Sequence, residues 1–114
     1  MNSRLKLAVL ILALVALGAC KNEQLTPVKT LLDDPARFDH QVVRVAGKVT
    51  ESVGVLGYGG YELNDGTGTI TIVTKSGGAP RTGAEVGVEG EFRSGFTLGT
   101  ESVAAVVEKR RFTP

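Results

Sequence analysis

The sequence predicts an all-β fold, a small five-stranded barrel with one short helix at its N-terminal end. The first observation is a hairpin pattern, in which residues 61–63 and 69–74 flank the turn sequence Asn-Asp-Gly-Thr-Gly at 64–68. The second is a pair of glycines within alternating apolar runs, where a strand must bend or pass close to another backbone. The third is the connection 75–83, which is too short and glycine-rich to hold a helix. A closed or nearly closed barrel accommodates all three observations, and a small β-sandwich is the alternative.

Residues 1–19 have the layout of a secretory signal peptide. Arg4 and Lys6 precede an uncharged apolar block at residues 7–17. The block is far shorter than the ~20 apolar residues that a membrane-spanning helix needs. We therefore expect this segment to be removed or used as an anchor, and not to fold with the domain.

A cysteine ends this block, where residues 17–20 are Leu-Gly-Ala-Cys. This short motif resembles the lipobox of bacterial lipoproteins. The resemblance implies that Cys20 receives a diacylglyceryl thioether, that the chain is cleaved before it, and that the new amino group is acylated with a fatty acid such as palmitate. Several acyl chains at ~0.8 kcal/mol per methylene make such attachment to the lipid bilayer effectively stable. The alternative is an ordinary signal peptide with a cysteine at its cleavage point.

The residue after Cys20 is Lys21 rather than aspartate. By the sorting habit of Gram-negative lipoproteins, this implies an outer-membrane protein that faces the periplasm. Residues 20–26 would then form the lipidated N-terminus and a polar tether, and residues 27–114 would form the domain. Cys20 is the only cysteine, which excludes a disulfide framework and a cysteine-based metal site.

The mature chain is close to electrical neutrality. Residues 20–114 contain 11 Lys and Arg residues against 12 Asp and Glu residues. Nucleic acids and anionic membrane surfaces are captured by a concentrated positive field. The overall composition therefore argues against nucleic acid as a partner, and the length favours a single domain.

A short helix is predicted to follow the tether. Thr26 is placed at the N-cap and Pro27 at the first helical position. Val28, Leu31 and Leu32 recur on one face before Asp-Asp-Pro at 33–35 ends the helix. With help from Phe38, this apolar face could plug one end of a barrel.

Five strands are predicted from alternation of apolar and polar residues. They are residues 42–51, 58–63, 70–74, 86–93, and from 96 or later to about 111, with connections at 53–57 and 93–95. Alternation points nine side chains inward: Val43, Val45, Val49, Leu63, Ile70, Ile72, Val86, Val88 and Phe92. Tyr61 shares the inward parity of Leu63, and Gly47 and Gly90 mark bends or close approaches.

Three blocks of residues resemble OB-fold domains of the bacterial exported and anticodon-like type. They are Leu32-x-Asp34-Pro35-x-x-Phe38-Asp39-x-Gln41-Val42-Val43-x-Val45-x-Gly47, then Leu63-x-Asp65-Gly66-Thr67-Gly68, then Pro80-x-x-Gly83-x-x-Val86-x-Val88-x-Gly90. The resemblance covers most of residues 28–111. It departs from the common pattern because the helix precedes the first strand, whereas OB domains often carry one between strands three and four.

The OB resemblance implies a ligand site on the outer face of the first three strands. The candidate binding residues on that face are Arg44, Lys48, Tyr58, Glu62, Thr69 and Thr71. The alternative is a solvated strand face with cross-strand ion pairs worth ~0.2–1 kcal/mol each. Residues 109–111, Lys-Arg-Arg, are interpreted as a solubilising strand end.

No catalytic constellation is evident in the sequence. His40 is the only histidine and stands in a polar turn, which predicts an exposed loop residue rather than a metal or haem ligand. The turn at 64–68 lacks the spaced acidic ligands of a calcium loop. We therefore predict no enzymatic activity, no cofactor and no metal site.

The expected function is a membrane-anchored, periplasm-facing lipoprotein whose barrel is a non-enzymatic binding or adaptor module. The predicted partner is a protein or a small envelope ligand. The first alternative is an oligonucleotide-binding OB domain, which the net charge disfavours. The second is haem or metal delivery, as in the haem chaperones of cytochrome c maturation. Those chaperones use a histidine near the C-terminal end of the barrel, whereas His40 precedes the first strand.

Overall fold

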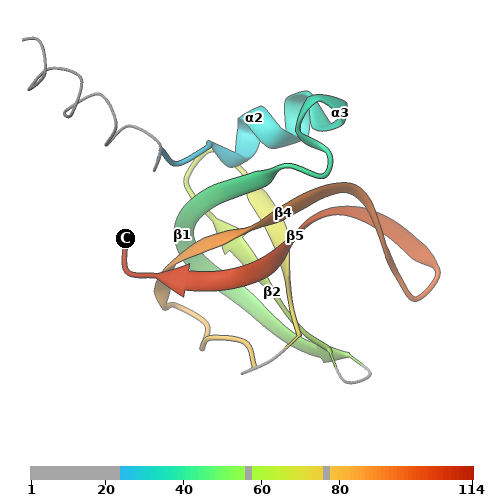
Figure 1. Cartoon of the computed structure of the whole chain (residues 1–114). Helices are drawn as coiled ribbons and strands as arrows, with labels where there is room; N and C mark the ends of the chain where they lie inside the picture. The colour runs from blue at the N-terminus through green and yellow to red at the C-terminus, as the bar shows by residue number, and fades with distance from the viewer. Residues whose placement is uncertain (1–23, 56–57, 76–77) are drawn as a thin grey trace, which may run out of the picture.

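The computed structural model describes residues 24–55, 58–75 and 78–114. The elements are α2 (Val28–Asp33), α3 (Pro35–Phe38), β1 (Val42–Val55), β2 (Tyr58–Asn64), β3 (Thr69–Thr74), β4 (Glu85–Leu98) and β5 (Glu101–Phe112). The strands close into a barrel in the order β1-β2-β3-β5-β4. Figure 1 shows α2 and α3 over one end of this barrel. The predicted all-β, five-stranded, OB-like fold is confirmed.

Neighbouring strands of the barrel are antiparallel, apart from the parallel pair β3–β5. The predicted hairpin is β2–β3, in which Leu63 lies opposite Ile70 and Tyr61 opposite Ile72. Its turn is stabilised by side chains that accept backbone hydrogen bonds: Gly66 N donates to Asn64 Oδ1 over 2.7 Å. Gly66 has a φ of 89°, a conformation that glycine adopts without a steric penalty.

The nine side chains predicted to point inward are buried with one exception. Eight of the nine predicted side chains are buried, and Tyr61 is buried beside them. Val86 is only partly buried, which corrects the prediction. The reason lies in the register: Val86 is opposite Gly47, which has no side chain to cover it. Val28 and Leu31 from α2 complete the core, as the helix pattern predicts, whereas Leu32 is 41% exposed, which corrects its place on the predicted apolar face.

Helix α2 begins one residue later than predicted. Pro27 is the N-cap, without a side-chain cap of its own, and Thr26 lies outside the helix, where its N–H donates to the Arg44 carbonyl over 2.7 Å. The cap comes from the β2–β3 turn instead: Val28 N donates to Asp65 Oδ2 over 2.9 Å. Pro35 ends α2 as expected but also begins α3, since proline fits the first helical turn.

Strand β4 is longer than predicted, and β5 begins only at Glu101. Residues 93–95 belong to β4 and not to a turn, so the β4–β5 hairpin projects beyond the rest of the barrel (Figure 1). Asp39 Oδ1 accepts a hydrogen bond from Ser94 N over 2.9 Å and holds the base of this projection. At the other end of the barrel, β1 runs to Val55, so the described part of the predicted connection 53–57 is strand.

The two mid-strand glycines are close approaches, as predicted. A Cβ on Gly47 would overlap the backbone carbonyl of Asn64, and one on Gly90 would overlap the carbonyl of Val107. The register between β4 and β5 also shifts next to Gly90. Any side chain at either position would therefore force a backbone to move.

Candidate functional site

The residues predicted to form one site on the outer face of β1–β3 separate into groups. Lys48, Asn64 and Thr69 form a row across the three strands, since Lys48 pairs with Asn64 and Asn64 with Thr69. Asn64 Nδ2 donates to Thr69 Oγ1 over 3.1 Å, and all three residues are exposed. This row presents one cation among short polar side chains.

Glu62 and Thr71 form the second group. Thr71 Oγ1 donates to Glu62 Oε1 over 2.7 Å across β2–β3. Glu62 also lies directly opposite Glu51 on β1. Like charges directly opposite each other repel, so this part of the face is locally acidic and unsuited to a phosphate backbone.

Arg44 lies apart from both groups, on the β4 side of β1. Its guanidinium carbon is 4.0 Å from the centroid of the Phe112 ring, and its Nη1 is 3.8 Å from Glu89 Oε1. Tyr58 begins β2, but its side chain lies outside the described part of the structure. The structure therefore gathers the described candidates in two groups and leaves Arg44 outside them.

A cleft of about 300 Å³ lies at the carboxyl ends of β3 and β5. Because these strands are parallel, their carboxyl ends meet at the same edge of the barrel. The cleft is lined by Thr74, Lys75, Glu108, Lys109, Arg110 and Arg111. The described lining thus contains four cationic side chains and one carboxylate. The sequence stretch 109–111, interpreted as a solubilising strand end, forms one wall of a cavity.

A polar network joins the floor of this cleft to the barrel interior. The buried Tyr61 hydroxyl donates to Glu108 Oε1 over 3.1 Å. Arg111 Nε donates to the same oxygen, and Arg111 Nη2 donates to the Gly78 carbonyl. Burial and the neighbouring Glu108 carboxylate raise the pKa of Tyr61, so its hydroxyl remains a donor at neutral pH.

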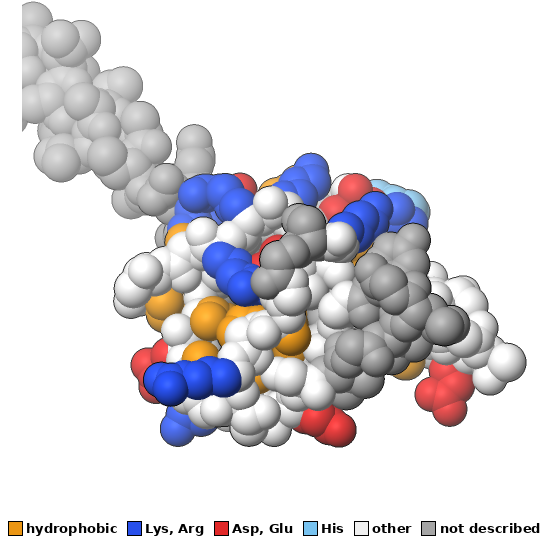
Figure 2. Space-filling model, turned by 90° about the horizontal axis from the view of Figure 1, so that it is seen from below, with side chains coloured by type: hydrophobic (Ala, Val, Ile, Leu, Met, Phe, Trp, Pro, Cys, Tyr) orange, Lys and Arg blue, Asp and Glu red, His pale blue; other side chains and the backbone are white. Residues whose placement is uncertain are grey.

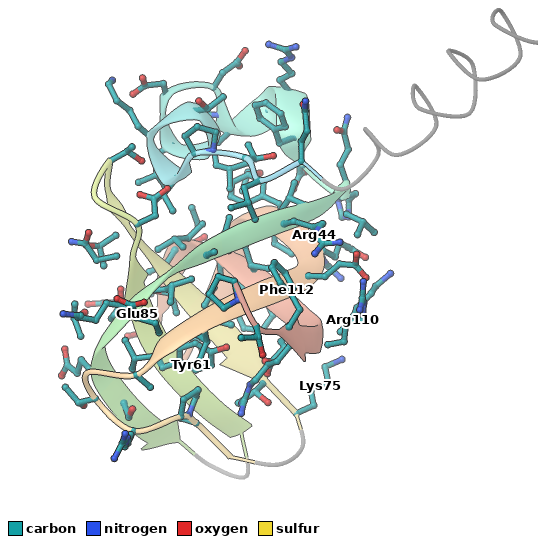
Figure 3. All side chains as sticks on the ribbon, turned by 90° about the vertical axis from the view of Figure 1, so that its left-hand side faces the viewer. Arg44, Tyr61, Lys75, Glu85, Arg110 and Phe112 are labelled. Carbon is teal, nitrogen blue, oxygen red and sulfur yellow. The ribbon has the colours of Figure 1, made fainter. Side chains whose placement is uncertain are left out.

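A second group of contacts borders the cleft. Arg110 Nε donates to Glu89 Oε2 over 2.8 Å, and Glu89 also faces Arg44. The hydrogen bond from Arg110 is the main cause that holds the pKa of Glu89 below its usual value. Figure 3 shows Arg44, Phe112, Arg110 and Lys75 along one side of the barrel, with Glu85 on the other side.

Elsewhere the surface is mixed. A hollow of about 310 Å³ is lined by cationic Lys48, by Asp65 and Glu85, and by uncharged residues. Figure 2 shows acidic and basic side chains interspersed over the face seen from below. Among the described residues, no group of His, Cys, Asp and Glu could hold a metal ion. His40 is exposed between Asp39 and Glu91, as expected of a loop residue.

The segment that carries the lipobox resemblance, residues 1–23, lies outside the described residues, and so does Cys20. Within residues 24–55, 58–75 and 78–114, the helices are all too short or too polar to cross a bilayer.

Comparison of the fold with solved structures gives matches to OB-fold proteins at low sequence identity. A protein assigned as an aspartyl-tRNA synthetase from Leishmania major Friedlin matches over 80% of this chain and 20% of its own, with a TM-score of 0.61 and 15% identity. The asparaginyl-tRNA synthetase from Pyrococcus horikoshii matches over 67% of this chain and 19% of its own, with a TM-score of 0.56 and 21% identity. The chain thus spans about a fifth of either synthetase.

A third match is an OBody, AM3L09, solved bound to hen egg-white lysozyme. It covers 67% of this chain and 83% of the OBody, with a TM-score of 0.53 and 12% identity. No protein-family model matches the chain, and a search of curated proteins finds no match. At these identities the comparisons define the class of the domain, an OB fold, and not its ligand.

Proposed function

We propose that the chain is a non-enzymatic OB-fold binding domain whose ligand is a single-stranded oligonucleotide. The observation that carries this proposal is the cleft at the carboxyl ends of β3 and β5, whose described lining holds four cationic side chains and one carboxylate. A phosphate backbone is captured by a local positive field, not by net charge. The near-neutral net charge is therefore no argument against nucleic acid as a ligand, because the charges are unevenly distributed over the surface.

Two further facts support this ligand. The side chains of Lys75 and Lys109 are exposed at the cleft, where Lys109 also lies within electrostatic reach of Glu89. Two proteins with similar folds act on tRNA, as their names state. The fold similarity supports the class of ligand, and the cleft supports its position.

Titration with single-stranded DNA and RNA tests the proposal. We expect the domain to bind, with affinity falling steeply between ~50 and ~200 mM salt because counterions are released from the phosphates. The double variant Lys75→Glu/Lys109→Glu should lose at least about tenfold in affinity, since a tenfold loss corresponds to only ~1.4 kcal/mol. Fluorescence anisotropy with labelled oligonucleotides measures both effects.

The matched control is Lys29→Glu/Arg37→Glu, which changes the net charge equally but on α2 and α3. Its affinity should stay near that of the parent protein. Equal losses in both double variants would show that only overall charge matters. No detectable binding at ~50 mM salt would reject the oligonucleotide as the ligand.

A second candidate ligand is a protein or small envelope ligand on the outer face of β1–β3. The observation that favours it is the pairing of Glu62 with Glu51, which makes this face unsuitable for phosphates. The OBody bound to lysozyme is a protein of similar fold solved in complex with another protein. Recovery of a single envelope protein with the soluble domain, abolished by Glu62→Lys, would favour this candidate.

The proposal places this domain on a lipid anchor at Cys20, on the outer membrane facing the periplasm. The lipobox resemblance at residues 17–20 is the support. Replacing Cys20 with serine should leave an unprocessed precursor or release soluble protein, because no thioether can form. Cell fractionation and the mass of the mature N-terminus measure this. Unchanged processing and membrane recovery in Cys20→Ser would refute the anchor.

A further inference from the structure

The four cations of the cleft are not equivalent. Arg111 donates to Glu108 and to the Gly78 carbonyl, and Arg110 donates to Glu89. Both guanidinium groups are therefore held by protein acceptors. Lys75 and Lys109 are exposed at the cleft, and the charge of Lys109 also acts on Glu89. A ligand that enters the cleft meets the two ammonium groups first.

The carboxylate of Glu108 limits what this cleft can bind. Its side chain is only 7% exposed, because the Tyr61 hydroxyl and the Arg111 guanidinium hold it at the cleft floor. Removing such a paired carboxylate from water is costly unless its partners remain in place. The ion pair between Glu108 and Arg111 therefore engages this guanidinium at the cleft floor.

We propose that this cleft is a binding site for a single phosphate group, held by Lys75 and Lys109, and that Glu108 competes with the phosphate for Arg111. Lysine suits this role because its ammonium group acts as a mobile point charge, whereas arginine is held here in a fixed geometry. A volume of about 300 Å³ has room for a phosphate group with several waters. The inference rests on the proposed function and names the chemical group that this site would recognise.

The chemistry of a phosphate group is shared by oligonucleotides, lipid headgroups and the free ion. The oligonucleotide is favoured because the OB fold and the cleft support it together. Inorganic phosphate is the first probe. Its binding is measured by NMR, from the chemical shifts of the backbone amides of residues 74–75 and 108–111. We expect saturable shifts confined to these residues, and competition between phosphate and a labelled oligonucleotide for the same cleft.

Three variants test the roles of the side chains. Lys75→Ala and Lys109→Ala should each weaken phosphate binding about three- to tenfold. Glu108→Gln should strengthen it about three- to tenfold, since an amide oxygen still accepts from Tyr61 but no longer neutralises Arg111. The control is Glu101→Gln, which makes the same charge change at the exposed start of β5 and should leave affinity unchanged.

The lysine variants alter exposed residues, so they keep the test decisive if Glu108→Gln fails to fold. Oligonucleotide binding that neither phosphate nor these variants change would overturn the phosphate site and place the oligonucleotide elsewhere on the domain, while keeping the oligonucleotide as the ligand. Phosphate binding without oligonucleotide binding would support the site and reject the proposed function. The last experiment measures binding to vesicles that contain phosphatidylglycerol and to vesicles of phosphatidylcholine alone. If the protein binds the vesicles with phosphatidylglycerol and the Lys75→Ala variant does not, a lipid headgroup is the source of the phosphate.

Discussion

Replacing Ile72 with alanine is expected to lower the free energy of unfolding by about 2–5 kcal/mol. Ile72 is fully buried at the centre of β3, opposite Tyr61 on β2 and Val106 on β5. The substitution removes apolar contacts on both sides and leaves a cavity that the closed barrel cannot collapse to fill. Urea denaturation followed by circular dichroism measures the change.

The matched control is Thr71→Ala, one residue earlier on the same strand. Thr71 points outward, and its hydroxyl donates to Glu62, so its loss should cost no more than about 0.5–1.5 kcal/mol. Equal costs at the two positions would contradict the strand parity. The two substitutions lie on the same strand, one residue apart, and differ in the face of the sheet that the side chain occupies.

The fold was predictable because a strand alternates with a period of two. One inward residue, such as Leu63, fixes the parity of its neighbours, and the hairpin turn at 64–68 fixes the pairing of the next strand. Among the nine residues predicted to point inward, burial failed to follow parity only at Val86, where the residue opposite is a glycine. Val73, which alternates onto the outward face with Thr71, is buried as well. The exception at Val86 depends on inter-strand register, which alternation within one strand does not contain.

The features that escaped prediction depend on partners distant in sequence. The cap of α2 comes from Asp65, 37 residues away. The extension of β4 past Arg93 is held by Asp39, 55 residues from Ser94. A local pattern such as Arg-Ser-Gly at 93–95 favours a turn, and tertiary hydrogen bonds decide otherwise.

The candidate site was predictable only in part for the same reason. Lys48, Glu62, Thr69 and Thr71 do lie on strands β1–β3, as the OB resemblance implies. The cleft around Lys75 and residues 108–111 brings together two stretches that are 33 or more residues apart, through the parallel pairing of β3 with β5. The net charge sums this basic cluster with acidic residues elsewhere in the chain, so composition does not reveal it. The only local signal was the basic run at 109–111.

Replacing Asp65 with alanine is expected to lower the free energy of unfolding by about 2–4 kcal/mol. One carboxylate accepts from Val28 N at the start of α2 and from Thr67 N, Thr67 Oγ1 and Gly68 N within the β2–β3 turn. Loss of a helix cap costs ~0.5–2 kcal/mol, and hydrogen bonds to a charged acceptor contribute ~1.5–3 kcal/mol. Asp65→Asn keeps one oxygen acceptor of the two and should cost less than Asp65→Ala. Asp33→Ala, which removes an exposed ion pair with Lys29, should cost ~0.5 kcal/mol or less.

The effect of Asp65 should also depend on pH. Partial burial raises the pKa of Asp65, but the hydrogen bonds from Thr67, Val28 and Gly68 outweigh it and hold the pKa below its usual 3.8. A carboxyl whose pKa is lower in the folded state stabilises the fold above the unfolded pKa, and this contribution is lost as the pH falls through the folded pKa. The stability difference between the parent protein and Asp65→Ala should therefore be largest near about pH 7 and shrink towards about pH 3. Urea denaturation at both pH values measures it, and an equal difference at the two would mean that the ionised carboxylate is not what joins α2 to the hairpin.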